Sequence, residues 1–155
     1  MLFRSTHAFL PMIERRRGGV LQVASLAAYQ PTPYFAVYGA TKAFVLSFGE
    51  ALWAEYKDRG VRVVTVSPGA TDTGFFSRAG EEASAGVKRV SPEGVARLGL
   101  EALRKNKPSV VHGFTNTLAT VLLRFFPRAF TARVMGWLGA PSPREMKGRS
   151  SPAVR

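Results

Sequence analysis

The chain has 155 residues, of which 46% are hydrophobic and 21% charged, and its formal net charge is +12. This length corresponds to about one domain, and the composition supplies enough apolar residues for a core, which excludes intrinsic disorder as the description of the whole chain. There is no cysteine, which excludes disulfide scaffolds and thiolate metal sites and favours a reducing, cytoplasmic location. His7 and His112 lie far apart in the sequence without a second ligand type at metal spacing, so we expect no metal site.

The excess of positive charge is concentrated in the last third of the chain. Residues 1–103 carry 12 basic and 9 acidic side chains, whereas residues 104–155 carry 10 basic and 1 acidic. A basic segment of this kind can attract anionic lipid or nucleic acid, although a solvated tail is its commoner role. No nucleic-acid-binding motif accompanies it, so we expect no nucleic-acid partner.

Apolar residues recur at helical spacing and in short continuous runs, in alternation. In chain order, the predicted elements are a helix over 2–15, a strand over 20–24, a helix over 38–57, a strand over 61–66, a helix over 92–104 and a strand over 109–112. This alternation predicts a parallel sheet with right-handed crossovers. Two further helices are expected over 118–126 and 130–138, separated at Pro127, and residues 140–155 are expected to be disordered.

Polar side chains follow the first two predicted strands, where a parallel sheet places its active sites. Ser25 follows the first strand, and Tyr38 and Lys42 begin the helix after it. Four residues apart on a helix, Tyr38 and Lys42 share one face, where an ammonium group stabilises a phenolate and lowers the phenol's pKa from about 10. A carbonyl held by Ser25 and Tyr38 would be polarised for hydride attack, and Tyr38 would supply the proton. Alone, a Tyr-x-x-x-Lys pair is also typical of a ring packed under a lysine on a surface helix.

Three segments occur in an order and at a spacing that are more specific than the Tyr-Lys pair. They are Gly19–Ser25, Tyr38–Lys42 and Val61–Thr73. Together they resemble the classical short-chain dehydrogenase/reductase family, over the chain from the first helix to about His112. The resemblance implies an α/β fold, the C-terminal part of a doubly wound, Rossmann-like parallel sheet with additional C-terminal helices. It also implies an oxidoreductase that interconverts an alcohol and a carbonyl with NAD or NADP.

The resemblance assigns roles to individual residues. The family's catalytic residues correspond to Ser25, Tyr38 and Lys42, of which Tyr38 and Lys42 also contact the cofactor. The loop that holds the nicotinamide corresponds to Pro68, Gly69, Ala70, Thr71 and Thr73. The substrate lid corresponds to the segment from Phe75 and Phe76 to Val90, and its two aromatic residues, with Tyr34, indicate a hydrophobic alcohol or carbonyl substrate. The resemblance also implies a homo-oligomer for the full-length protein.

The sequence lacks three features of the family. These are the Gly-rich strand-to-helix turn that seats the pyrophosphate, the Asn-Ala-Gly motif, and the catalytic asparagine in the helix before the Ser25 strand. Gly18 and Gly19 precede a strand, so they are not the phosphate-binding turn. We therefore expect a truncated or remnant form that lacks on the order of 100 residues. Whether the 155-residue chain is active by itself is left open. Its expected division is a partial Rossmann-like domain (1–115), a C-terminal helical segment (116–139) and a basic tail (140–155).

Two other functions are compatible with the sequence. The first is a non-catalytic interaction module that docks through a helix bearing Phe44, Phe48, Leu52 and Trp53. The second is an anionic membrane-surface binder, in which an amphipathic stretch over 118–138 carries Arg124, Arg128 and Arg133. The commoner arrangement for such a stretch is a helix that covers the sheet or the substrate cleft, with its arginines in water.

Overall fold

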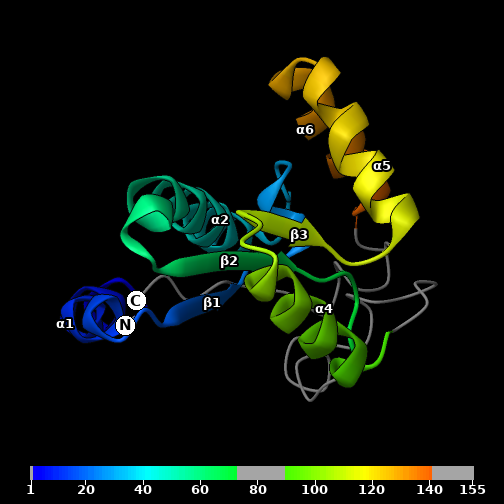
Figure 1. Cartoon of the computed structure of the whole chain (residues 1–155). Coiled ribbons are helices and arrows are strands. Elements are labelled where there is room, and N and C mark those ends of the chain that lie inside the picture. Colours follow the sequence, from blue (N-terminus) through cyan, green and yellow to red (C-terminus); the bar gives the residue numbers. More distant parts are fainter. Residues whose placement is uncertain (1, 73–89, 141–155) are drawn as a thin grey trace.

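The computed structural model describes residues 2–72 and 90–140. Its centre is a parallel sheet of three strands in the order β1-β2-β3, formed by β1 (Gly19–Val23), β2 (Arg62–Ser67) and β3 (Ser109–Val111) (Figure 1). Parallel neighbours need crossover connections. The crossover from β1 to β2 contains α2 (Ala36–Tyr56), and the crossover from β2 to β3 contains α4 (Pro92–Arg104). The predicted parallel sheet is confirmed.

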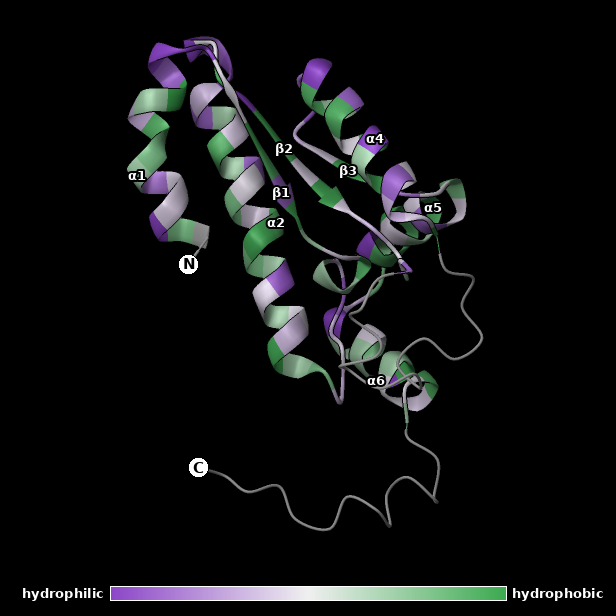
Figure 2. Ribbon diagram, turned by 90° about the horizontal axis from the view of Figure 1, so that it is seen from below, coloured by the Kyte–Doolittle hydropathy of each residue, from purple (hydrophilic) through white to green (hydrophobic). Residues whose placement is uncertain are grey.

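Helices cover both faces of this sheet. Strand residues that are neighbours in sequence point to opposite faces, and Gly49 of α2 packs against Thr65 whereas Gly99 of α4 packs against Val66. Therefore α2 and α4 lie on opposite faces of β2. The first helix, α1 (Leu2–Arg15), lies beside α2 (Figure 1, Figure 2). This layered arrangement is the α/β architecture that the sequence predicts.

The central strand is the most completely buried part of the molecule. Its apolar run is typical of a strand that has neighbours on both edges and helices on both faces. The fully buried valines of β2 and of the residue before it are Val61, Val63, Val64 and Val66. Leu10 and Leu52 extend this core into α1 and α2.

Local signals set the ends of the helices. The N-cap of α4 is Ser91, whose Oγ accepts a hydrogen bond from the Gly94 backbone N at 3.1 Å, and Pro92 occupies the first helical position. A 3-10 turn, η2 (Lys57–Arg59), continues α2. It ends at Gly60, whose φ of 78° is left-handed and favours glycine.

The predicted boundaries are confirmed to within two residues up to β3. The helices predicted over 2–15 and 92–104 have those bounds, and α2 begins at Ala36 rather than at Tyr38. The C-terminal helices differ more, because Gly113 has a φ of 94° and turns the chain directly out of β3 into a helix. They are α5 (Phe114–Leu122), a 3-10 turn η4 (Leu123–Phe125) and α6 (Arg128–Leu138).

The structure corrects the predicted docking surface on α2. Leu52 is buried in the core, and Trp53 Nε1 donates a hydrogen bond to the Asn106 carbonyl oxygen at 2.9 Å. Phe44 is exposed and stacks on Phe48, whose ring also meets Phe3 of α1. The four residues do not form one exposed face, because α1 packs over the same side of α2.

Some expectations concern residues that the structure does not describe. Thr73, most of the substrate lid, with Phe75 and Phe76, and the tail from residue 141 lie outside the described residues. Within residues 2–72 and 90–140, no three potential metal ligands gather at one place. No helix in these two ranges has the length and hydropathy needed to cross a bilayer.

Candidate active site

The carboxyl ends of the three strands form one edge of the sheet, and backbone hydrogen bonds join the loops that leave it. The Leu26 N–H, directly after Ser25, donates to the Pro68 carbonyl oxygen at 3.1 Å, and the His112 N–H donates to the Ser67 carbonyl oxygen at 3.1 Å. The residues after β1, β2 and β3 are therefore fixed beside one another. Open α/β sheets bind ligands at this edge.

Ser25 lies at the start of a 3-10 turn, η1 (Leu26–Ala28). Its backbone is extended, and its Oγ accepts a hydrogen bond from the Ala27 backbone N at 3.2 Å. This N-cap bond uses an oxygen lone pair and not the hydroxyl proton. The Ser25 hydroxyl is thus held in place by the turn while it keeps a proton to donate.

Tyr38 and Lys42 lie in the first two turns of α2 and are brought together as predicted. The Lys42 Nζ lies 5.8 Å from the centroid of the Tyr38 ring, and it donates a hydrogen bond to the Val23 carbonyl oxygen at 3.0 Å. Val23 is the last residue of β1, two positions before Ser25. Lys42 therefore connects the helix that carries the tyrosine to the strand end that carries the serine.

Burial lowers the pKa of Lys42 from the usual 10.5. Below the lowered pKa both the folded and the unfolded chain hold the proton, so the cost of burying the charge is fully present. Between the lowered pKa and 10.5, only the unfolded chain holds the proton, and the contribution of Lys42 to the free energy of unfolding rises with pH.

We expect this rise to disappear in a Lys42→Met variant, because methionine keeps the chain length without a titrating group. The free energy of unfolding in urea, measured for both proteins at a series of alkaline pH values, checks this expectation. The quantity to compare is the difference between the two proteins at each pH. A difference that stays constant with pH would contradict the expectation.

The loop after β2 holds itself in a fixed shape. Thr71 Oγ1 donates to the Gly69 carbonyl oxygen at 3.1 Å, and the Val90 N–H donates to the Ala70 carbonyl oxygen at 2.9 Å. Pro68, Gly69, Ala70 and Thr71 are thus described, and all four lie at the carboxyl edge of the sheet.

A contact from the C-terminal segment to this loop could not be found in the sequence. The Asn116 side chain donates from Nδ2 to the His112 carbonyl oxygen at 2.8 Å. A Cβ added to Gly69 would lie 3.1 Å from the same Nδ2. Asn116 therefore packs on the Gly69 backbone and ties the start of α5 to the loop. This contact exists because α5 begins directly after Gly113, which brings Asn116 to the loop. No local sequence motif predicts the contact.

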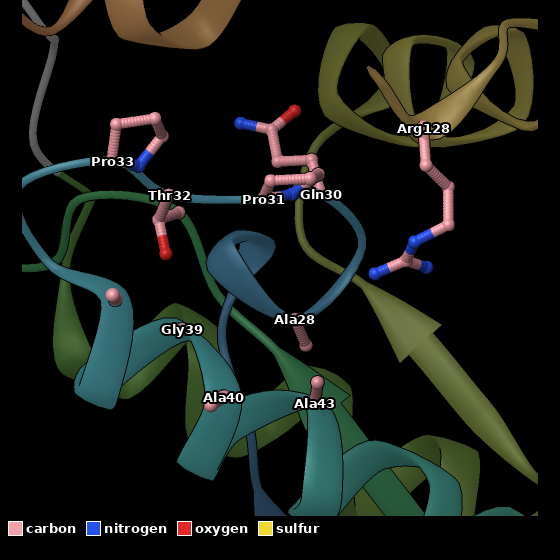
Figure 3. A pocket seen from close by; sticks show the side chains of 10 residues that line it. Ala28, Gln30, Pro31, Thr32, Pro33, Gly39, Ala40, Ala43 and Arg128 are labelled. Carbon is pink, nitrogen blue, oxygen red and sulfur yellow. The ribbon is translucent and has the colours of Figure 1, made fainter. Parts of the chain in front are cut away.

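A hollow of about 350 Å³ lies between the first turns of α2 and the segment from Ala28 to Pro33 (Figure 3). Its α2 wall is made of small residues, and the Arg128 side chain reaches toward it from α6. None of Ser25, Tyr38 and Lys42 lines it. The hollow is thus beside the predicted catalytic residues but on another face of α2.

Comparison with known proteins shows the relationship. A family model described as short chain dehydrogenase matches residues 2–84, which is more than half of the chain. The chain belongs to the short-chain dehydrogenase family. It is 44% identical over 66 residues to the very-long-chain 3-oxoacyl-CoA reductase of Anas platyrhynchos, a match that covers 42% of this chain and 21% of that protein.

Solved structures of the family share the fold. A 7beta-hydroxysteroid dehydrogenase superposes with a TM-score of 0.73 and 26% identity, covering 87% of this chain and 54% of its own. A short chain dehydrogenase from Burkholderia cenocepacia in complex with NADP gives a TM-score of 0.69 and 25% identity, covering 84% of this chain and 52% of its own. This short-chain dehydrogenase chain spans about half the length of the solved structures that it resembles.

Proposed function

We propose that the protein is a nicotinamide-dependent oxidoreductase that interconverts an alcohol and a carbonyl by hydride transfer. The observation that carries the proposal is the position of Lys42, whose ammonium lies near the Tyr38 ring and is bonded to the strand end that leads to Ser25. The similarity to a 3-oxoacyl-CoA reductase and a hydroxysteroid dehydrogenase supports this reaction class.

Each of the three side chains has a distinct task in this reaction. The Ser25 hydroxyl donates a hydrogen bond to the substrate oxygen and orients it. Tyr38 gives its phenolic proton to that oxygen as negative charge develops there in reduction, and accepts the proton in oxidation. The ammonium of Lys42, 5.8 Å from the centroid of the Tyr38 ring, is placed to offset negative charge at the tyrosine oxygen during proton transfer. A bound nicotinamide supplies or accepts the hydride.

The residues at the carboxyl edge suit one end of a dinucleotide. The ammonium of Lys42 has three donors, of which the bond to Val23 uses one, so two remain for ribose hydroxyls. The loop from Pro68 to Thr71 would hold the carboxamide. Gly18 and Gly19 run into β1 rather than into a helix, so the described residues include no Gly-rich turn for the pyrophosphate. We propose NAD or NADP as the cofactor, and the solved complex of a relative with NADP supports this class.

We also propose a hydrophobic alcohol or carbonyl compound as substrate and a homo-oligomeric assembly. The substrate class is supported by relatives that are named for 3-oxoacyl-CoA and hydroxysteroids, whereas the assembly rests on the family resemblance alone.

Turnover measured with pure protein tests the proposal. The protein is isolated from its source cells and its mass is determined first, so that the polypeptide under assay is known. Oxidation of NADH and of NADPH is then followed with 3-oxoacyl-CoA and steroid ketone substrates. We expect one nicotinamide cofactor to support reduction of at least one ketone. Protein of verified mass that neither binds nor oxidises either cofactor would overturn the proposal.

A further inference from the structure

The helix α5 is amphipathic, but it turns its polar side inward. Thr120 exposes only 6% of its surface, and Asn116 is half-buried against Gly69. The large apolar residues of α5 and η4 recur at intervals of three and four, which places them on one face of a helix. That face is exposed to solvent, and its residues are Phe114, Leu118, Val121, Leu122 and Phe125.

The helix α6 likewise buries a polar residue and exposes apolar ones. Thr131 exposes 5% of its surface, whereas Trp137 exposes 79%. Phe130 is half-exposed and stacks on Phe126, with 5.4 Å between ring centroids. Both helices project from the sheet rather than lie across it (Figure 1). The segment therefore does not cover the sheet, but it borders the residues before α2, since a Cβ on Gly136 would lie 3.6 Å from Pro33. The other half of the expectation, a cover for the substrate cleft, stays a prediction.

Positive charge accompanies these exposed rings. Arg133 is exposed on α6, whereas Arg124 and Arg128, also exposed, border a hollow between the segment and residues Tyr29 and Pro31. None of these three arginines has an ion-pair partner among the described residues. No aspartate or glutamate occurs between Glu101 and Glu145. The segment thus combines an apolar, aromatic surface with cationic side chains and contains no acidic residue.

We propose that α5, η4 and α6, residues 114–138, bind to the surface of an anionic lipid bilayer. Phenylalanine and tryptophan rings suit the boundary between headgroups and acyl chains, and arginines suit lipid phosphates. A second copy of the chain is a poor occupant, since it would bring two sets of three unpaired arginines together in a chain of net charge +12. A nucleic acid would pair with the arginines but leave the apolar face in water.

Tryptophan fluorescence with vesicles tests the proposal, which is independent of the catalytic one. The chain has two tryptophans, so a Trp53→Phe background leaves Trp137 as the reporter. With vesicles of equimolar phosphatidylglycerol and phosphatidylcholine, we expect a blue shift of its emission and quenching by brominated acyl chains. With phosphatidylcholine alone, we expect neither. An unchanged spectrum with the anionic vesicles would overturn the proposal, as would quenching that is equal for both compositions.

Two variants in this background separate the parts of the surface. Arg124→Glu with Arg128→Glu should weaken binding to the anionic vesicles by more than about tenfold, because each cation near such a surface contributes a factor of about five and two cations are lost. The matched control is Arg15→Glu with Arg16→Glu, at the end of α1, which changes the net charge equally and should leave the affinity within about twofold. Equal weakening by both variants would overturn the proposal.

The second variant, Phe125→Ser with Leu118→Ser, should lower binding to the anionic vesicles and abolish the quenching. Circular dichroism of both variants is the control that their helices are retained. Sedimentation velocity without vesicles completes the test. A dimer that is lost in the Phe125→Ser, Leu118→Ser protein would show that a second copy covers the apolar face, and would overturn the lipid proposal.

Discussion

A Tyr38→Phe variant is expected to lower kcat for ketone reduction by about 10²–10⁴-fold, the range typical of losing a general acid. Phenylalanine keeps the ring beside the Lys42 ammonium but has no proton to give to the substrate oxygen. The bond from Thr41 Oγ1 to the residue 38 carbonyl oxygen is a backbone contact and is retained. The ring and backbone contacts are kept, so we expect the variant to remain folded, with Tm lower by no more than about 2–4 °C.

A Tyr56→Phe variant is the matched control for this experiment. Tyr56 is the last residue of α2, at the end of the helix away from Tyr38, and phenylalanine keeps its ring contact with Arg59, so the same loss of a hydroxyl there should leave kcat within about twofold. Steady-state rates with a saturating cofactor, and melting curves for all three proteins, decide the outcome. If Tyr38→Phe kept its kcat, Tyr38 would not be the proton donor. A fall in Tm larger than the one expected would assign the loss to folding.

A Gly49→Ala variant should cost about 1–3 kcal/mol of the free energy of unfolding, the range for overpacking a close-packed core. A Cβ at this position would overlap Thr65 Oγ1 and lie 2.8 Å from Gln22 Oε1. Both partners are buried and have no hydrogen-bond partner within the described residues, so the cost comes from packing rather than from a broken bond. For a chain of this size, each kcal/mol lowers Tm by about 2–4 °C.

Gly94→Ala is the control that separates crowding from the general effect of removing a glycine. Gly94 lies in the first turn of α4, and a Cβ there would meet its nearest atoms at 3.4 and 3.7 Å, which is ordinary contact. Alanine favours the helix by about 0.5–1 kcal/mol, so we expect an equal or higher Tm. Equal changes of Tm in the two variants would contradict the packing of α2 on β2 described here.

The sequence predicts the order and type of the elements up to β3 because local signals mark them. Ser91 and Pro92 cap α4, and Gly60 ends the turn after α2. The valine-rich stretch Val61–Val66 indicates a buried parallel strand. The meeting of Tyr38 with Lys42 is likewise predicted, because it depends only on helical spacing within α2.

Tertiary contacts could not be predicted in the same way. The bond from Lys42 to the Val23 carbonyl joins residues 19 apart, and its existence depends on how α2 crosses β1. The contact of Asn116 with Gly69 joins α5 to a loop more than forty residues away. The amphipathic pattern of α5 predicts a helix correctly, but periodicity alone does not say whether the apolar side faces a core or the outside.

The bond between Lys42 and the end of β1 gives the Lys42 amine two roles. It carries a charge beside Tyr38, and it fixes the distance between α2 and the end of β1. A small slide of α2 along the sheet would change the length of this bond. The bond therefore links the position of the helix to the position of the ammonium beside the Tyr38 ring. Changes in the segment between Ser25 and Tyr38, which includes two prolines at 31 and 33, would act on both at once. Sequence variation in that segment is thus a route by which such a site can be retuned without replacing a reacting group.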